Sequence, residues 1–412
     1  MIPALDPDPA VPQRDLLLDR SLVARRLARL LGADEPLSID ECRQLRVKYR
    51  VGARLRVVYR IRVGSASFDV AASTFPTLER SERAYAEARR RAVTCGPVWP
   101  VALDRDLAAV FWTFPNDRKI AHLPAVARPD PELVGLLPEW SRSALASYAP
   151  EKAATVRCLD DTERTVAFAK VYAGEDGQRA SRVHETLTRQ LPADDSHLRL
   201  PRALAYSTRH RTLIVEAVEG LALGAAGYRR LGRALARLHD LAPPDRARFR
   251  RADPDRIEAA AELIGSVRRD VAADARSLAR EISPQLDPGG DPVCLHGDVN
   301  FRNALLENGR VALIDLDQVA AGPAAAELGS VLASLRYAGV VGLLRPPIVP
   351  ELCAALLSGY SELRETPGGG PIRSHTAAAL LAERSLRVVT RVRPEGLRRL
   401  PALLAEAREA LE

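Results

Sequence analysis

The chain has 412 residues, of which 47% are hydrophobic and 27% charged, as in globular proteins large enough for two or three domains. Its net charge of +7 rests on 60 basic residues, of which only four are lysines, and the arginines are spread along the whole chain. A nucleic-acid interface would show as a basic stripe or a known module, and the sequence has neither, so we expect no nucleic-acid partner. The positive net charge does fit a mild preference for anionic partners.

The cysteines and the apolar segments indicate where the protein resides. Five cysteines stand far apart without a Cys-x-x-Cys pair, which favours a reducing compartment over a disulfide framework or a zinc site. The N-terminus is acidic and broken by prolines, unlike a signal peptide. No apolar run approaches the roughly 18–20 residues that span a bilayer. We therefore expect a soluble, cytoplasmic protein with no membrane partner.

The first part of the chain predicts a small α+β lobe. Residues 1–15 read as a loose tail, and 15–31 have the apolar spacing of a helix. Between 45 and 75 apolar residues recur at every second position, with turns near Gly52 and Gly64, which predicts a meander of three strands. The segments that follow predict a polar helix and two apolar strands, at 79–93, 97–103 and 108–115.

The same plan then repeats. The second copy predicts three strands, a helix and two further strands, at 144–172, 175–191 and 198–220. Aligning Tyr49 with Tyr148 and Phe111 with Leu213 matches the two halves, with an offset that drifts from 99 to 102 residues. We infer a duplicated lobe whose first copy is degraded. The alternative is two unrelated lobes that share a generic order of strands and helix.

From residue 228 the chain is mostly helical. The segment 228–241 is amphipathic, and 253–282 predicts one long helix or two shorter ones. Four more helical segments follow, at 323–344, 346–365, 375–392 and 395–412. Clefts between a β-rich lobe and a helical lobe commonly hold small ligands.

Polar residues gather in the stretch from Cys294 to Pro323. The apolar run "VCLHGD" ends at Asp298, and the apolar strand "VALIDLD" contains Asp315 near its end, with Asn303 between the two. A hairpin that brings these three side chains to one mouth would make a hard-oxygen site suited to Mg²⁺. It would also leave one carboxylate to orient a hydroxyl, a combination that suits phosphoryl transfer.

The order and spacing of these motifs resemble a known family. The triplet "HGD" at 296–298, Asn303 and the run "IDLD" at 314–317 look like the catalytic signature of the aminoglycoside phosphotransferase and choline kinase family. These small-molecule kinases are relatives of protein kinases, whose catalytic loop has the same Asp-to-Asn spacing. The resemblance covers about residues 148–337 and includes the helix "LGRALARLHDL". It implies a two-lobed, protein-kinase-like α+β fold with a β-rich N-lobe and a helical C-lobe, preceded here by a degenerate N-lobe-like cap.

Domain boundaries follow from combining the duplication with this resemblance. We expect the cap at residues 1–135, the N-lobe with its hinge at 136–222 and the helical C-lobe at 223–412. Ser73 stands where the second copy has Lys170, so the cap would be a lid or a substrate-specificity element, not a second nucleotide site.

The resemblance also implies roles for individual residues. Asp298 would be the catalytic base or would orient the acceptor hydroxyl, and Asn303 and Asp315 would bind Mg²⁺. Asp317 lies nearby without a firm role. His296 would have a structural role in the catalytic loop.

Other residues would bind the nucleotide. Lys170 would contact the ATP phosphates and pair with Glu185, and the hinge from Glu216 to Val218 would offer backbone groups to the adenine. Lys170 is one of only four lysines and stands in an apolar strand, which favours a functional ammonium over one that merely reaches out to water.

Two residues outside the motifs are expected to be structural. His239 reads as a packed helix histidine. Glu327 stands where the family often has an aspartate, and we expect it to cap or brace the loop.

Three functions stay in view. The first is an ATP- and Mg²⁺-dependent kinase that phosphorylates a hydroxyl of a small molecule, the second a catalytically silent pseudokinase-like module and the third a protein kinase. The last lacks a recognisable activation segment. No Gly-x-Gly-x-x-Gly loop covers the phosphates, which leaves their contacts to Ser147, Lys152 or main-chain amides and leaves ATP versus GTP open.

The acceptor is less well defined by the sequence. Acceptors of the family include aminoglycosides, sugars and natural products. The arginine-rich segment 384–400 disfavours a polycationic aminoglycoside and favours a neutral or anionic hydroxyl compound. The oligomeric state is not indicated by the sequence.

Overall fold

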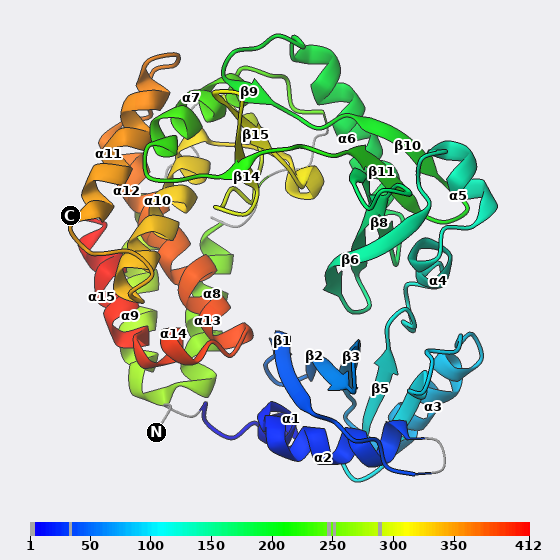
Figure 1. The fold of residues 1–412 in the computed structure, drawn as a ribbon. Coiled ribbons are helices and arrows are strands. Elements are labelled where there is room, and N and C mark those ends of the chain that lie inside the picture. Colours follow the sequence, from blue (N-terminus) through cyan, green and yellow to red (C-terminus); the bar gives the residue numbers. More distant parts are fainter. Residues whose placement is uncertain (1–4, 33–34, 245–248, 250–252, 287–290) are drawn as a thin grey trace.

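The first lobe is built on a five-stranded antiparallel sheet with the strand order β1-β2-β3-β5-β4 (Figure 1). The structure, a computed structural model, describes residues 5–32, 35–244, 249, 253–286 and 291–412. The elements of this lobe are α1 (Arg14–Leu18), α2 (Arg20–Leu31), β1 (Glu41–Arg50), β2 (Arg54–Val63), β3 (Ala66–Thr74), α3 (Leu78–Arg89), β4 (Val101–Asp104) and β5 (Ala109–Thr113). The α+β character predicted for this lobe is confirmed.

The second lobe repeats this topology. Its sheet has the order β6-β7-β8-β11-β10, so that in both lobes a meander of three strands is followed by a helix, and the last strand inserts beside the third. Two short helices, α4 (Leu123–Ala127) and α5 (Pro131–Leu136), connect the lobes. The elements of the second lobe are β6 (Arg142–Ala149), β7 (Ala153–Leu159), β8 (Thr165–Tyr172), α6 (Asp176–Gln190), β10 (Ala203–Ser207) and β11 (Thr212–Glu216).

The strand register corrects one detail of the alignment between the two copies. Lys170 pairs with Leu213, whereas Ser73 pairs with Val110 and not with Phe111. If Ser73 of the cap corresponds to Lys170 of the N-lobe, then the strand partner of Ser73, which is Val110, corresponds to the strand partner of Lys170, which is Leu213. Because side chains alternate between the two faces of a strand, this shift of one residue in the alignment also changes the face of the sheet on which each matched side chain is expected to lie.

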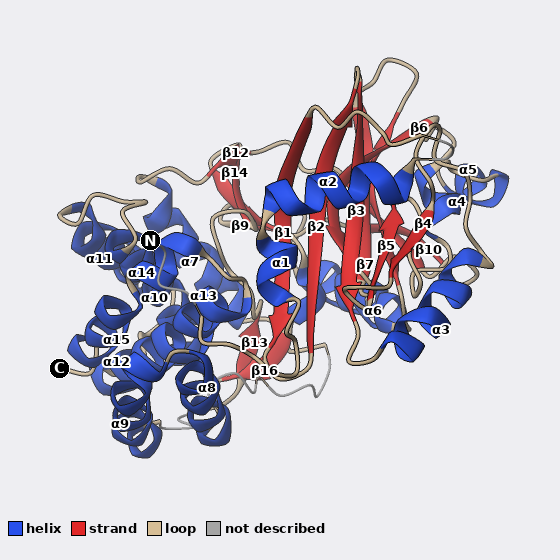
Figure 2. Cartoon of the chain, turned by 90° about the horizontal axis from the view of Figure 1, so that it is seen from below, coloured by secondary structure: helices blue, strands red, loops and turns tan. Residues whose placement is uncertain are grey.

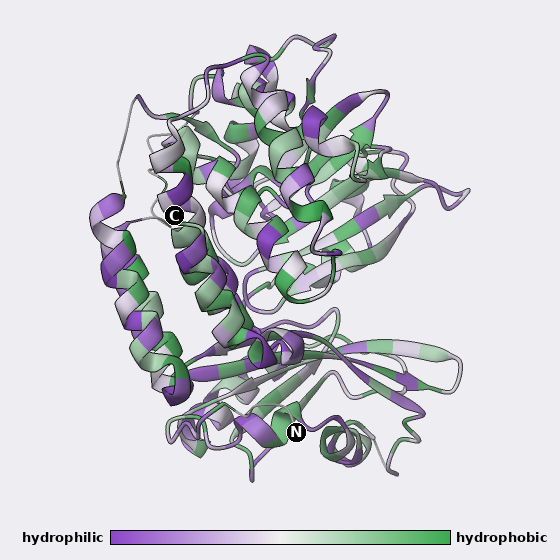
Figure 3. Ribbon diagram, turned by 90° about the vertical axis from the view of Figure 1, so that its left-hand side faces the viewer, coloured by the Kyte–Doolittle hydropathy of each residue, from purple (hydrophilic) through white to green (hydrophobic). Residues whose placement is uncertain are grey.

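The third lobe is mostly helical. Segment 253–282 forms two helices separated by a 3₁₀ turn at Arg269–Val271, which decides between the two alternatives left by the sequence. Figure 3 shows hydrophobic and hydrophilic residues alternating around the long helices, as expected of helices that pack on one side. The helices are α7 (Gly227–His239), α8 (Pro254–Val267), α9 (Ala272–Ile282), α10 (Ala324–Val340), α11 (Ile348–Ser361), α12 (Gly369–Ala379), α13 (Leu386–Thr390), α14 (Pro394–Arg398) and α15 (Leu400–Glu409). Within the described ranges no helix is both long and apolar enough to cross a membrane.

The strands around the signature motifs pair differently from the prediction. The expected hairpin between "VCLHGD" and "VALIDLD" is wrong, because β13 (Val293–Leu295) pairs with β16 (Ala320–Gly322). The hairpin is instead formed by β14 (Ala304–Glu307) and β15 (Arg310–Leu313), which follow Asn303. Two short strands, β9 (Leu198–Arg199) and β12 (Leu221–Ala222), extend this hairpin into a four-stranded sheet with the order β12-β14-β15-β9.

The cap contacts both other lobes. Helix α2 lies across one face of its sheet (Figure 2), and the opposite face shares a buried cluster with the N-lobe that includes Trp112 and Val156. The expectation of a loose tail is wrong for residues 5–15, and residues 1–4 lie outside the described part of the chain. Leu5 is buried with helices of the C-lobe, and the amide of Asp6 donates to the carbonyl of Val267 at 2.8 Å.

Candidate active site

A cleft of about 1350 Å³ lies between the N-lobe and the helical lobe, and the edge strand of the cap reaches its wall. Six of the seven residues that the sequence assigns to the site line this cleft: Lys170, Glu216, Val218, Asp298, Asn303 and Asp315. The fold thus brings residues that are up to 145 positions apart in the sequence to the same cleft. Glu185, the seventh, does not line it.

Lys170 joins the two lobes across the cleft. Its ammonium lies 2.7 Å from Oδ1 of Asp315 and 2.8 Å from Oδ2 of Asp317. Burial lowers the pKa of Lys170, but the two carboxylates raise it more, so that its net pKa lies above the ordinary value. Burial raises the pKa of Asp315, but the charge and the hydrogen bond of Lys170 lower it by more, so the net pKa lies below the ordinary value. Lysine and aspartate are therefore both charged at neutral pH.

The predicted pair between Lys170 and Glu185 is wrong. Glu185 is exposed on α6 and accepts a hydrogen bond from the hydroxyl of Ser181, 3.0 Å away. The two aspartates already hold the ammonium of Lys170. Two other residues of α6 reach this region: His184 lines the cleft, and the guanidinium of Arg179 donates to the carbonyls of Asp317 and Val319 at 3.1 and 2.7 Å.

The segment that follows β15 has a shape set by Asp315. This residue adopts a left-handed conformation, with φ 64° and ψ 65°, and the next three residues form a 3₁₀ turn. An aspartate tolerates that conformation better than most non-glycine residues. The hydroxyl of Tyr172 donates to Asp317 at 2.8 Å and fixes the second carboxylate. Both acids thus face Lys170 from one short turn.

Glu327 braces the catalytic loop, as the sequence suggested. It is buried on α10, and its carboxylate accepts from the amides of His296 and Gly297 at 3.1 and 2.7 Å. It also lies 3.1 Å from Nε2 of His239, which is buried as predicted. Burial raises the pKa of Glu327, and the bonds from His239 and the loop lower it more, so that its net pKa lies below the ordinary value.

His296 and Gly297 set the path of the loop that carries Asp298. Nε2 of His296 lies 2.9 Å from the carbonyl of Ile314, and its Nδ1 accepts from the amide of Asp298 at 3.3 Å. The structural role predicted for His296 agrees with these contacts. Gly297 has φ +79°, and a Cβ there would lie 2.2 Å from the carbonyl oxygen of Gln318. Only glycine fits this close approach.

Asn303 contacts the main chain at Asp298 and at Ile314, the residue before Asp315. Its amide nitrogen donates to the carbonyl of Asp298 at 3.0 Å, and its main-chain carbonyl accepts from the amide of Ile314 at 2.9 Å. With the nitrogen so engaged, its side-chain oxygen is the atom that suits a hard cation. No group of three or more His, Cys, Asp or Glu side chains that could hold a metal occurs in the ranges described. Mg²⁺ normally takes only one or two protein carboxylates and completes its shell with phosphates and water, so Asn303 and Asp315 fit this use.

Asp298 has a partner that sequence reasoning missed. Nη2 of Arg387, on α13, lies 3.1 Å from Oδ1 of Asp298. The two residues are 89 positions apart, and Arg387 stands among many arginines in a helix without a family motif. No local signal marks it, and only the fold brings it to the site.

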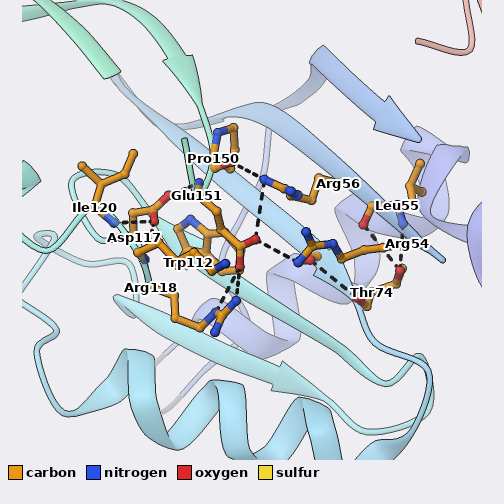
Figure 4. A network of polar contacts seen from close by, with 12 residues as sticks. Arg54, Leu55, Arg56, Thr74, Trp112, Asp117, Arg118, Ile120, Pro150 and Glu151 are labelled. Carbon is orange, nitrogen blue, oxygen red and sulfur yellow. Dashed lines mark hydrogen bonds and ion pairs between the residues drawn. The ribbon is translucent and has the colours of Figure 1, made fainter. Parts of the chain in front are cut away.

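The turn between β6 and β7 is held by arginines of the cap and of the linker that follows it. Glu151 in this turn has φ 58° and is buried. Its carboxylate lies 2.9 Å from Nη1 of Arg54 and 2.6 Å from Nη2 of Arg118 (Figure 4). Burial raises the pKa of Glu151, and Arg118, Arg56 and Arg54 lower it more, so that its net pKa lies below the ordinary value. A turn without glycines is thus fixed from outside by arginines of the cap and the linker.

The hinge offers fewer backbone groups than expected. The amide of Glu216 already donates to the carbonyl of Arg202 at 3.0 Å, and its carboxylate binds Arg199 and Arg202. Val218 follows the end of β11 and lines the cleft. Of the two predicted hinge residues, Val218 is therefore better placed to donate an amide hydrogen to a base.

Residues 139–366 match the model of a family described as the phosphotransferase enzyme family. This match spans more than half of the chain and begins after the cap sheet. The chain belongs to the phosphotransferase enzyme family. The two-lobed, kinase-like fold and the family resemblance predicted from the motifs are thereby confirmed. A comparison with curated proteins finds no match to this phosphotransferase.

Three solved structures show a distant likeness to this chain. A mutant aminoglycoside phosphotransferase in a ternary complex with ADP and hygromycin B is 14% identical, with a TM-score of 0.49, and covers 68% of this chain and 98% of its own. An amicoumacin kinase in complex with AMP-PNP, Ca²⁺ and Ami is 12% identical, with a TM-score of 0.48, and covers 70% of this chain and 96% of its own. A choline/ethanolamine kinase family protein from Mesorhizobium loti is 14% identical, with a TM-score of 0.47, over 70% and 93%. At these values the neighbours say nothing about the substrate of this phosphotransferase.

Proposed function

We propose that this phosphotransferase uses ATP and Mg²⁺ to phosphorylate a hydroxyl group of a small molecule. The observation that carries the proposal is the convergence of Lys170, Asp298, Asn303 and Asp315 on one cleft, from two lobes of the chain. Phosphoryl transfer depends mostly on positioning and on neutralising charge, and these four side chains supply both.

Each side chain has a distinct task in the transfer. Lys170 would contact the phosphates of the nucleotide. Asp298 would orient the acceptor hydroxyl and accept its proton while the hydroxyl oxygen bonds to the γ-phosphorus. The bond from that phosphorus to the bridging oxygen breaks, and ADP leaves with the electron pair. The proton passes from Asp298 to water.

Asn303 and Asp315 would hold Mg²⁺, which neutralises phosphate charge when bound. The hinge at Val218 would meet the base, which is adenine in ATP or guanine in GTP. The domain boundaries at residues 135 and 222 and a cytoplasmic location remain predictions from the sequence.

A nucleotide-binding module without turnover is the alternative, and Asp298→Asn distinguishes the two. We expect the variant to bind ATP with Mg²⁺ as the parent does, while ADP release on a panel of hydroxyl acceptors falls by about 10²–10⁴-fold. Asp255→Asn, on the exposed face of α8, serves as the control. Normal turnover by Asp298→Asn would refute the role of Asp298. A parent protein that binds ATP but releases no ADP with any acceptor would favour the silent module.

A further inference from the structure

We infer that the acceptor is an anionic hydroxyl compound, bearing a phosphate or a carboxylate, whose charged group binds a basic cluster built jointly by the cap and the helical lobe. The basic cluster consists of Arg46, Lys48, Arg384, Arg387, Arg391 and Arg393. The inference rests on the proposed phosphotransferase activity and adds to it the chemical class of the acceptor.

The cap strand β1 contributes one side of the basic cluster. Val47 and Tyr49 on this strand are buried in the core of the cap, so Arg46 and Lys48 point to the opposite face. Arg46 lines the same cleft as Asp298 and donates to the carbonyl of Tyr148 at 3.5 Å. The edge strand of the cap therefore supplies positive charge to the cleft that holds the proposed catalytic acid.

The helical lobe contributes the other side. Arg384 lies in the π-helical turn before α13, Arg387 lies on α13, and Arg391 is the C-cap of that helix. A π-helical turn at Leu380–Ser385 leads into α13, and such turns are frequent at functional sites. Arg384 and Arg387 line the cleft, and Arg387 also binds Asp298.

The two sides of the basic cluster are in direct contact. Nη1 of Arg391 donates to the carbonyl of Val47 at 3.2 Å, which places the guanidinium beside the strand that carries Arg46 and Lys48. Arg393, two residues further, also lines the cleft. The cluster is thus one continuous patch, and it is incomplete without the cap.

Little negative charge on the protein balances this patch. Among the described residues, Arg46, Lys48, Arg391 and Arg393 form no ion pair, whereas Arg387 pairs with Asp298 and Arg384 lies 3.8 Å from the carboxylate of Glu383. Burial, followed by repulsion from neighbouring cations, lowers the pKa of Lys48 to about 8 and that of Arg391 to about 10. Like charges held this close are costly when two carboxylates face six cations, and a bound anion relieves that cost.

The nucleotide is not the anion that this patch requires. Its phosphates would meet Lys170 and Ser147, which line the cleft from the N-lobe. The basic cluster instead lies beside Asp298, where the acceptor hydroxyl has to sit. Guanidinium groups bind phosphate and carboxylate through two parallel hydrogen bonds, whereas a cationic acceptor would be repelled. The anionic group takes no part in the transfer and only positions the hydroxyl.

The test compares four hexoses that differ in charge. The protein is first saturated with AMP-PNP and Mg²⁺, so that anions cannot enter the nucleotide site, and is then titrated by calorimetry with glucose 6-phosphate, glucuronate, glucose and glucosamine. We expect at least one of the two anionic sugars to bind about tenfold or more tightly than glucose and glucosamine. The phosphate and the carboxylate arms show which anionic group the cluster prefers.

Variants assign the effect to the basic cluster. Arg46→Gln and Arg393→Gln should each weaken binding of the preferred anionic sugar by about fivefold or more, since each removes a charged hydrogen-bond donor. Arg43→Gln is the matched control, because Arg43 lies on the same strand, is exposed and pairs with Glu41. Its affinity for the sugar should not change.

Two kinds of result would overturn the inference. One is that neither anionic sugar binds more tightly than glucose or glucosamine, including the case in which none binds up to about 10 mM. The other is that an anionic sugar binds equally well to the parent, Arg46→Gln and Arg393→Gln. The first step of the experiment separates this failure from a failure of the proposed function. A parent protein that does not bind AMP-PNP refutes the kinase proposal, whereas one that binds AMP-PNP without preferring anions refutes only the anionic acceptor.

Discussion

The ammonium of Lys170 lies 2.7 Å from the carboxylate of Asp315, although 145 residues separate them in sequence. Lys170 comes from the central part of the N-lobe sheet, and Asp315 comes from the turn after β15 in the helical lobe. The pair therefore exists only when the two lobes are correctly placed. A nucleotide entering the cleft would meet both charges at once, so affinity for ATP reports directly on this geometry.

Glu327→Gln should loosen the catalytic loop. The substitution weakens two bonds to the amides of His296 and Gly297 and the contact with His239, so we expect the free energy of unfolding to fall by about 1–3 kcal/mol. Turnover should fall more than ATP affinity, because the loop positions Asp298. Urea unfolding and ADP release measure the two effects. Glu395→Gln, a half-exposed side chain on α14, should change neither.

The contribution of Glu327 should also depend on pH. Its pKa in the folded protein lies below the ordinary value of about 4.3. The stabilisation is therefore present at neutral pH and is lost as the pH falls through the folded pKa. The stability difference between the parent and Glu327→Gln should shrink between about pH 5 and pH 3. A difference that stays constant over this range would contradict the assigned charge of Glu327.

Gly297→Ala should damage the loop, whereas Gly309→Ala should be milder. Both glycines have positive φ, +79° and +85°, but a Cβ at Gly297 would meet Gln318 at 2.2 Å while one at Gly309 meets nothing within 4 Å. A left-handed alanine costs about 1–2 kcal/mol, and the clash adds to that only at Gly297. Urea unfolding of both variants measures the difference. Equal losses would show that the contact with Gln318 is unimportant.

Glu151→Gln should weaken the junction between the cap and the N-lobe. It removes the charge that Arg54 and Arg118 share, and these buried charge-assisted bonds contribute about 1–3 kcal/mol. We expect a lower melting temperature and weaker ATP binding, because this turn joins β6 and β7, whose residues Ser147 and Thr155 line the cleft. Glu163→Gln, in the exposed turn between β7 and β8, is the matched control. If ATP affinity were unchanged, the turn would have no role in binding the nucleotide.

Local patterns predicted most of the elements and the core of the site. The meander strands carry a strict alternation, and the motifs around Asp298, Asn303 and Asp315 have fixed spacings, so both could be read from short segments. The pairing of β13 with β16 could not, because a strand of three residues has no periodicity that indicates its partner.

The contacts made by arginines were equally hidden in the sequence. Arginines occur throughout the chain, so nothing singles out Arg387 as the partner of Asp298 or Arg118 as the partner of Glu151. Glu185 was assigned by resemblance alone, and the arrangement of α6 turns it to solvent. Contacts between side chains that are tens of residues apart depend on how the lobes pack against each other. Hydrophobic periodicity and motif spacing carry no information about that packing.

The most direct test of the kinase proposal is calorimetric titration with ATP, with and without Mg²⁺, of the parent, Lys170→Ala and Asp315→Ala. Lys119→Ala is the control, since Lys119 is exposed in the linker between the cap and the N-lobe. We predict Mg²⁺-dependent binding to the parent and to Lys119→Ala, and a loss of about tenfold or more in affinity for both site variants. Equal affinity in the parent and Lys170→Ala, or no binding to the parent, would contradict the assignment of this cleft to ATP.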